Sequence, residues 1–393
     1  MPYLEPMPEK KNELEQHIAV FGESSSGKTV LVSSFYGAAQ QAAFVENSLY
    51  RVVANDIGQG SRLNRNYLGM RDEATPPLAT QFAATSYAFS IKLKEPPAAR
   101  APKDQPFDAL RLVWHDYPGE WFEQSLTGEE AQRRIDTFRA LLHSDVALLL
   151  VDGQRLLDHA GEEERYLKSL FNNYMNGLLT LKDDVLVDGK PLVQFPRIWM
   201  VALSKADLLP DMDAYAFRDM LDLKAADDIN ELRSVLKSFV QAPDAMSVGE
   251  DFLLLSSGKF EPGKIDLSER RGVDLVLPVA SILPLERHAR WAKLQNLPGK
   301  VAENLLGAGF YVLGAALLGK KFFGKAIPLP LAAALAFLNK DVVDAASRVA
   351  NDALRDLNEK ALAKRNYVTA TLTQFQLDLN TAEAKRTLLR SAK

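Results

Sequence analysis

The residues best suited to chemistry run from Gly22 to Thr29, with the sequence Gly-Glu-Ser-Ser-Ser-Gly-Lys-Thr. Glycines at this spacing let the backbone curl so that its N–H groups converge on phosphate oxygens. The lysine suits the outer phosphates, where it also serves catalysis, and the threonine hydroxyl suits Mg²⁺. The predicted phosphate-binding residues are Gly22, Glu23, Ser24, Ser25, Ser26, Gly27, Lys28 and Thr29.

The surroundings of this loop favour that interpretation over a Ser/Gly-rich surface turn. An apolar run at 17–21 precedes it, and Val30, Leu31 and Val32 follow it. Strand, glycine loop and helix is the context in which the pattern binds phosphate, with the positive end of the helix aimed at the anion.

A second pattern, Asp116-x-x-Gly119, follows the predicted strand at 107–115. A carboxylate at Asp116 can hold Mg²⁺, usually through water. The N–H of Gly119 can bond a terminal phosphate and move when that phosphate leaves. An ordinary Asp/Gly turn is the alternative.

A third pattern, Ser204-Lys205-Ala206-Asp207, follows the apolar run at 197–203. The carboxylate of Asp207 can accept hydrogen bonds from the ring N–H and the amino group of guanine, a pair that adenine lacks. Lys205 would pack its stem over the base. A helix N-cap segment is the alternative. Ser256 and Ser257, directly after the run at 251–255, would bring backbone to the guanine oxygen.

Periodicity predicts the elements that position these patterns. We expect strands at 17–21, 85–94, 107–115, 145–151, 197–203 and 251–255, and helices at 27–43, 129–142, 156–181 and 213–240. The strands 85–94 and 107–115 should pair antiparallel, and 44–80 should be a long polar connection. Alternation of strands and helices predicts an α/β fold with a mainly parallel sheet covered on both faces, whose ligands lie at the carboxyl ends of the strands.

In this order the patterns resemble those of the P-loop GTPases of the translation-factor and Ras-like class, over about residues 17–260. The string Asp116-Tyr117-Pro118-Gly119-Glu120-Trp121 is similar to a segment of the YcjX-like bacterial GTP-binding proteins. The resemblance implies a bacterial cytoplasmic switch that binds GTP or GDP with Mg²⁺, and it says little about the partner.

The chain departs from the Ras-like pattern at several positions. Ser204 stands where Asn or Thr is usual, and Glu120 stands where Ras-like proteins keep a water-orienting glutamine, which implies slow intrinsic hydrolysis. The threonine that senses Mg²⁺ and the γ-phosphate is assigned to Thr80, with Thr75 and Thr85 as alternatives. An arginine finger could come from Arg62, Arg65 or Arg71, although solvated loop arginines are the simpler interpretation.

Composition excludes several other classes of protein. The 393 residues are 47% hydrophobic and 25% charged, as in ordinary globular proteins. The net charge of -4 gives no bulk basic surface, so we expect no nucleic-acid partner. No cysteine is present, which excludes disulfides and thiolate chemistry.

The stretch 304–339 is apolar, with only lysines as charged residues. Each of its two uncharged runs is shorter than the roughly 18 residues that cross a bilayer as a helix. The stretch suits a helical hairpin buried against the rest of the chain, or a hairpin tip that meets an anionic membrane. Residues 341–393 should form charged amphipathic helices.

We therefore divide the chain into a polar leader (1–16), a GTPase domain with insertions (17–290) and a helical region (291–393) that contains the hairpin 304–339. We expect a Mg²⁺-dependent GTP-hydrolysing switch whose C-terminal helices act on an unknown protein partner or on the inner membrane. A nucleotide scaffold that does not hydrolyse GTP and a dynamin-like membrane-remodelling GTPase are the alternatives. An ATPase is disfavoured by Asp207, and the oligomeric state stays open.

Overall fold

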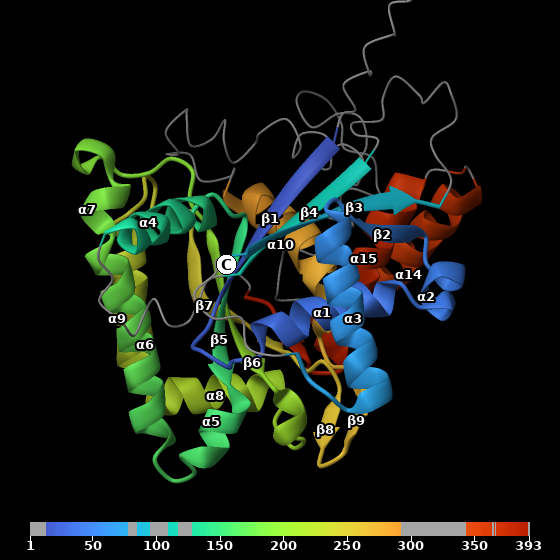
Figure 1. Cartoon of the computed structure of the whole chain (residues 1–393). Coiled ribbons are helices and arrows are strands. Elements are labelled where there is room, and N and C mark those ends of the chain that lie inside the picture. Colours follow the sequence, from blue (N-terminus) through green and yellow to red (C-terminus); the bar gives the residue numbers. More distant parts are fainter. Residues whose placement is uncertain are drawn as a thin grey trace, which may run out of the picture.

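A mixed β-sheet forms the centre of the computed structural model, which describes residues 13–77, 85–94, 109–116, 128–291, 343–363, 365 and 367–391 (Figure 1). Its strand order is β10-β7-β6-β5-β1-β4-β3-β2. The five strands from β7 to β4 are parallel, and β2, β3 and β10 are antiparallel to their neighbours. The strands are β1 (Glu13–Phe21), β2 (Tyr50–Ala54), β3 (Thr85–Leu93), β4 (Ala109–Asp116), β5 (Val146–Asp152), β6 (Ile198–Ser204), β7 (Ser247–Leu254) and β10 (Leu388–Leu389).

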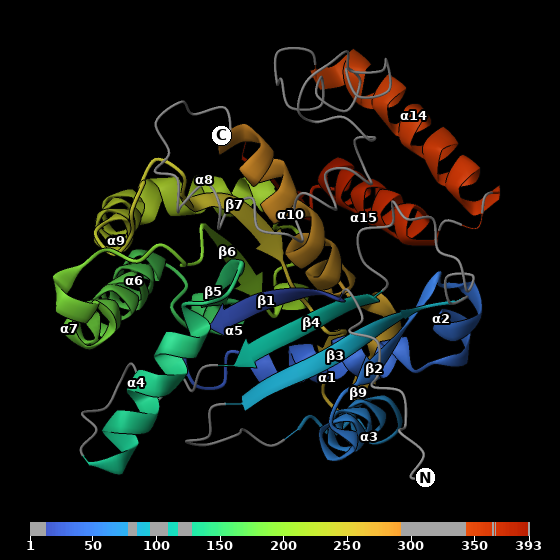
Figure 2. The same ribbon diagram turned by 90° about the horizontal axis from the view of Figure 1, so that it is seen from above.

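Helices cover both faces of this sheet, which confirms the predicted fold class (Figure 2). One face packs against α1, α3, α10 and α15, and the other against α4, α6, α8 and α9. A short hairpin of β8 (Lys259–Glu261) and β9 (Lys264–Asp266) lies outside the main sheet. The helices are α1 (Lys28–Ala39), α2 (Ala42–Asn47), α3 (Ile57–Glu73), α4 (Glu129–Leu141), α5 (Gly153–Asp158), α6 (Glu163–Thr180), α7 (Lys182–Val185), α8 (Ala214–Lys224), α9 (Ala226–Lys237), α10 (Val276–Trp291), α14 (Val343–Ala363) and α15 (Tyr367–Ala384).

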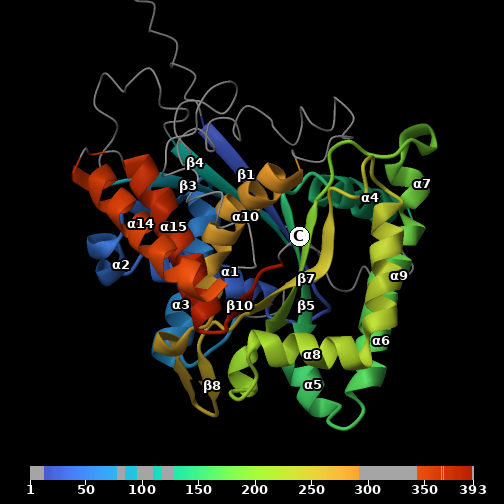
Figure 3. The same cartoon turned by 180° about the vertical axis from the view of Figure 1, so that it is seen from behind.

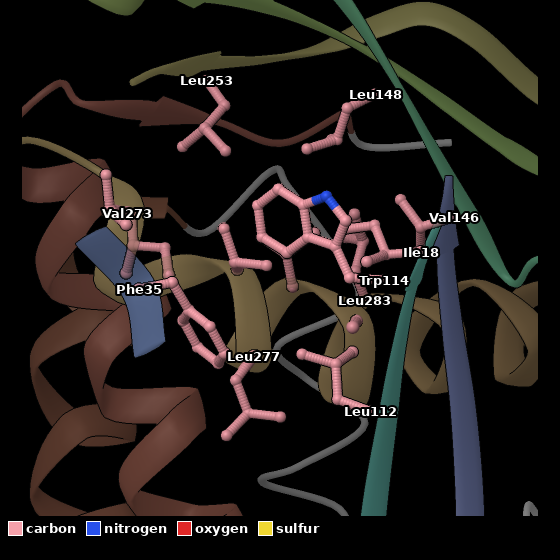
Figure 4. Packing of buried hydrophobic residues seen from close by; sticks show 14 of the residues in the cluster. Ile18, Phe35, Leu112, Trp114, Val146, Leu148, Leu253, Val273, Leu277 and Leu283 are labelled. Atoms are coloured by element: carbon pink, nitrogen blue, oxygen red, sulfur yellow. The ribbon is translucent and has the colours of Figure 1, made fainter. Parts of the chain in front are cut away.

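The central strands are apolar because both of their faces are covered. Every residue of β5 and β6 is buried, as their continuous apolar runs predict. On β1, Ile18 and Val20 belong to the core beneath α1 and α10, whereas Ala19 and Phe21 belong to the opposite core. Trp114 fills the centre of the first core, with its ring 6.1 Å from that of Phe35 (Figure 4). Because both faces of the sheet are packed, the strand ends from which the loops leave are held in place.

The prediction of a long polar connection over 44–80 is wrong, because β2 and α3 lie there. β2 is an edge strand with little burial, so its sequence shows no strong apolar signal. α3 buries only a narrow stripe, and Gly60 in that stripe lies against Tyr36 of α1, where a side chain would collide. Gly60 is therefore a helix-packing residue and not a sign of a loop. Asp56 begins α3 by accepting a hydrogen bond from the N–H of Gln59 (2.6 Å).

Smaller differences concern element ends. β1 begins at Glu13, four residues before the predicted start. The predicted helix at 156–181 is divided into α5 and α6, and that at 213–240 into α8 and α9. The antiparallel pairing of β3 with β4 is confirmed.

The C-terminal region is helical as predicted, and it also returns to the sheet. α14 packs on α15, α15 packs on α10, and β10 then pairs with β7. The hairpin 304–339 lies outside the described residues, so its two interpretations and the domain boundaries stay predictions. In the described part of the chain, no helix has the length and apolar character needed to span a membrane.

A buried ion pair holds α10 on β7. Arg287 donates to Asp251, both side chains are 0% exposed, and Asp251 also accepts the N–H of Ser391 at 2.8 Å. Arg287→Ala would leave a buried carboxylate without its cation, so we expect a loss of about 3–5 kcal/mol in the free energy of unfolding. Urea denaturation measures this loss. Arg355→Ala, which removes an exposed ion pair with Asp352, is the control and should cost under about 1 kcal/mol. Equal losses in both variants would contradict the assignment.

Candidate functional site

The loop between β1 and α1 has the curled backbone that its glycines predict. Ser25 and Gly27 adopt left-handed conformations, with φ of 64° and 89°. The Lys28 ammonium, in a side chain that is 9% exposed, donates to the carbonyl oxygens of Gly22 (2.8 Å) and Glu23 (3.0 Å). The lysine is thus folded back over its own loop, at the N-terminus of α1.

The loop borders open space at Gly27 and is tightly packed at Gly22 and Ser26. A Cβ added to Gly27 would meet nothing within 4 Å, so the loop faces open space there. The Ser26 hydroxyl is buried, and within the described residues it has no hydrogen-bond partner. A Cβ on Gly22 would come within 2.4 Å of that hydroxyl and 3.2 Å of Leu150, so this position requires glycine.

The two predicted metal ligands in the described part of the chain lie at the same end of the sheet. Thr29 is in the first turn of α1. Asp116 is the last residue of β4, where it pairs with Val20 of β1, one residue before the end of that strand. The parallel register therefore brings the buried Asp116 carboxylate beside the start of the phosphate loop.

The predicted base-recognition residues also come together. Asp207 lies in a short 3₁₀ turn, Ala206–Leu208, directly after β6. Its Oδ1 accepts a hydrogen bond from Ser256 Oγ (2.6 Å), and its Oδ2 accepts one from the N–H of Phe260 (3.1 Å). The Ser256 loop is tied to α1 as well, because Ser34 Oγ donates to the Ser257 carbonyl (3.3 Å). A phosphate-type loop and a carboxylate suited to guanine thus share one edge of the sheet.

A family model, Double-GTPase 2, matches residues 16–235 of the chain. The chain belongs to the Double-GTPase 2 family. The match covers the phosphate loop, Asp116 and Asp207, and it confirms the predicted P-loop GTPase resembling the YcjX-like proteins. No curated protein matches the chain.

In this Double-GTPase 2 domain, sequence reasoning missed two residues beside the loop. Asp152, 2% exposed at the end of β5, accepts from Lys205 Nζ (2.8 Å) and caps α5 by accepting the N–H of Gln154. Arg155 of α5 pairs with the buried Glu23 of the phosphate loop at 3.1 Å. The sequence did offer a signal for Asp152, because it is the last residue of a buried strand, as Asp116 and Ser204 are.

Several predicted positions lie outside the described residues, namely Thr80, Gly119 and Glu120. The three arginines considered as possible arginine fingers all lie on α3, namely Arg62, Arg65 and Arg71. Arg71 is bonded to Asp72 and to Gln41, at the far end of α1 from the loop. Ser204 is buried and donates from its hydroxyl to the Val151 carbonyl (3.3 Å), a link between β6 and β5.

Two histidines, one on β1 and one on β4, contact each other. His17 Nδ1 and His115 Nε2 are 2.9 Å apart, and the Asp145 carboxylate accepts the backbone N–H of His17 at 2.7 Å. Burial, with His17 and His143 nearby, lowers the pKa of His115 to about 4. Burial raises the pKa of Asp145 to about 6.

These shifts have opposite effects on stability. Between pH 4 and 6.5, His115 binds a proton in the unfolded chain but not in the folded one. Its contribution to stability therefore rises from about pH 4 to 6.5 and is complete above that pH. The folded Asp145 keeps a proton that the unfolded chain releases, so its contribution falls as pH rises from 3.8 to about 6.

Asp145→Asn removes the contribution of the Asp145 carboxyl, which falls as pH rises, and leaves that of His115. The amide oxygen can still accept the His17 N–H. Relative to the native chain, we expect the variant to gain about 2–3 kcal/mol between pH 4 and pH 7. Urea denaturation across this range measures the gain. Asp188→Asn, at a side chain that is 75% exposed, is the control. A variant whose stability parallels that of the native chain at every pH would disprove the assignment.

Proposed function

We propose that the chain binds GTP with Mg²⁺ and hydrolyses it to GDP and phosphate, as a molecular switch. The observation that carries the proposal is the Asp207 carboxylate, held by Ser256 at the sheet edge that bears the phosphate loop. In this proposal Asp207 accepts the N–H and amino group of guanine. Lys205, positioned by Asp152, packs along the base, and the Ser257 backbone contacts the guanine oxygen.

On the phosphate side, each group has a chemical role that suits its position. The Lys28 ammonium, which now bonds two loop carbonyls, exchanges them for β- and γ-phosphate oxygens. The N–H groups of the glycine loop suit the phosphate oxygens, whereas the buried Ser26 hydroxyl lies against Gly22. Thr29 would hold Mg²⁺ directly, and Asp116 would hold it through water. Mg²⁺ would neutralise charge that develops on the phosphates.

Hydrolysis requires a positioned water. We assign that task to Glu120, the residue after Gly119, and we assign Thr80 to Mg²⁺ and the γ-phosphate. A carboxylate near phosphate charge orients water less well than a glutamine, so intrinsic turnover should be slow, at a rate comparable to or below that of Ras-like proteins, on the order of 10⁻⁴ s⁻¹.

The direct test is binding and single-turnover hydrolysis of GTP by the purified chain, with Mg²⁺ or with EDTA, and with ATP in parallel. We expect GTP binding, slow phosphate release that depends on Mg²⁺, and at least about a hundredfold weaker binding of ATP. Tighter binding of ATP than of GTP would overturn the base assignment.

A nucleotide scaffold without turnover is the alternative that Glu120 favours. Bound GTP that remains intact over several days, with no gain in rate from Glu120→Gln, would support the scaffold. A gain in rate for Glu120→Gln would support the switch.

The output of the switch is proposed to reach an unknown protein partner, or the inner face of a bacterial cell membrane, through the C-terminal region. A dynamin-like role would add GTP-dependent membrane binding by residues 304–339. Flotation with anionic liposomes, with and without GTP, separates a membrane output from a protein-partner output. The protein-partner output predicts no flotation in either state.

A further inference from the structure

The last described residues of the chain, 386–391, lie beside β7 and the start of α8 (Figure 3). On one side they extend the sheet, with Leu388 opposite Leu253 and Leu389 opposite Phe252 of β7. The N–H of Leu254 donates to the Thr387 carbonyl at 3.0 Å. Two residues further along the chain is Ser256, the hydrogen-bond partner of Asp207. We call residues 386–391 the C-terminal clamp.

On its other side the clamp holds the start of α8. The N–H of Ala214 donates to the Arg386 carbonyl at 2.8 Å, and the Arg386 guanidinium pairs with Asp213 at 3.0 Å. The same guanidinium lies over the Tyr215 ring, 4.7 Å from its centroid. Asp213 follows Asp207 by only six residues, through the short 3₁₀ turn. One segment of the chain therefore contacts both the strand that leads into the Ser256 loop and the start of the helix that follows the Asp207 turn.

The clamp is anchored to α10, α15 and β7. Arg390, 11% exposed, pairs with Glu286 of α10 (2.8 Å) and with Glu383 of α15 (2.6 Å). The N–H of Ser391 donates to the buried Asp251, which also pairs with Arg287. The positions of α10, α15 and the two base loops are thus linked through these six residues.

We infer that the C-terminal clamp positions the Asp207 and Ser256 loops for guanine, so that docking of the C-terminal region on the sheet sets the rate of nucleotide release. The inference rests on the proposed guanine-nucleotide binding. Arg386, Ala214 and Asp213 are positioning residues, since they act on the base only through the loops. Loosening the clamp should weaken recognition of the base more than it weakens contacts to the phosphates.

Ala214→Pro tests the contact between the clamp and α8 with little loss of helix stability. Ala214 is the first residue of α8, where proline is favoured, and Asp213 before it has an extended conformation that tolerates a following proline. Proline removes the N–H that bonds Arg386 and places its ring against that carbonyl. We expect GDP release to accelerate about tenfold, the effect of losing one buried hydrogen bond and crowding its acceptor.

Arg386→Ala and Asp213→Asn test the ion pair, and asparagine retains the helix cap. Each should accelerate GDP release about two- to fivefold, and the double variant should be no faster than Arg386→Ala alone, because both remove one interaction. Arg355→Ala, an exposed ion-pair deletion on α14, is the matched control and should leave release unchanged.

Selectivity separates positioning from mere destabilisation. IDP lacks the amino group that Asp207 would accept, so the ratio of IDP to GDP dissociation constants measures alignment of the base loops. A positioning role predicts that this ratio falls about threefold or more in Ala214→Pro. A structural role alone predicts a lower melting temperature with the ratio unchanged, and that result would overturn the inference. A native chain that binds neither nucleotide would instead overturn the proposed function, and the inference with it.

Discussion

Replacing Lys28 with alanine is expected to weaken GTP binding by at least about a hundredfold and to abolish measurable hydrolysis. The ammonium is the one cation of the loop sequence, and it lies where the N-terminus of α1 also attracts anions. Two charge-assisted hydrogen bonds to phosphate, at roughly 1.5–3 kcal/mol each, account for a loss of this size. Titration with a fluorescent GTP analogue measures it directly.

The same substitution should also lower the free energy of unfolding. The Lys28 ammonium donates to the carbonyls of Gly22 and Glu23, so its loss removes two hydrogen bonds from a charged donor, each worth roughly 1.5–3 kcal/mol. Binding is therefore compared under conditions in which the variant remains folded. Lys168→Ala on α6, which deletes an exposed lysine paired with Glu164, is the control for binding. If Lys28→Ala binds GTP within threefold of the native chain, the loop from Gly22 to Thr29 does not hold the phosphates.

The central part of the fold and the predicted site could be inferred from sequence because each signal is local. β5 and β6 are continuous apolar runs, and the residues that follow them must lie at the carboxyl edge of a parallel sheet. That geometry alone brings Asp207 and Ser256 to one end of the molecule. The glycine loop requires only its own eight residues and the strand before it.

The features that escaped prediction depend on contacts between distant segments. α3 has an interrupted apolar stripe because Gly60 and Tyr67 pack closely on α1, and only the tertiary structure explains those choices. β10 has two residues and no periodicity of its own. It pairs with β7, and beyond it the N–H of Ser391 donates to the buried Asp251, 140 residues earlier in sequence, which also pairs with Arg287. No local sequence pattern predicts a contact between residues so far apart in the chain.

Asp207→Asn should convert the base preference from guanine to xanthine. Asparagine presents one acceptor and one donor, whereas guanine requires acceptors for both its ring N–H and its amino group. We expect GTP affinity to fall about a hundredfold and affinity for xanthosine triphosphate, which carries an oxygen in place of the amino group, to rise by a similar factor. Competition against a fluorescent GDP analogue measures both.

The neighbours of Asp207 determine which way the new amide must face. Phe260 offers only an N–H, so the amide oxygen should face it, and the amide nitrogen should face Ser256 Oγ, which can also accept a hydrogen bond. The variant therefore keeps a satisfied site and should fold as the native chain does. Asp211→Asn, at an exposed aspartate four residues away, is the control and should leave the base preference unchanged. If Asp207→Asn loses GTP without gaining xanthosine triphosphate, the carboxylate supports the loop through Phe260 and Ser256 and does not contact the base.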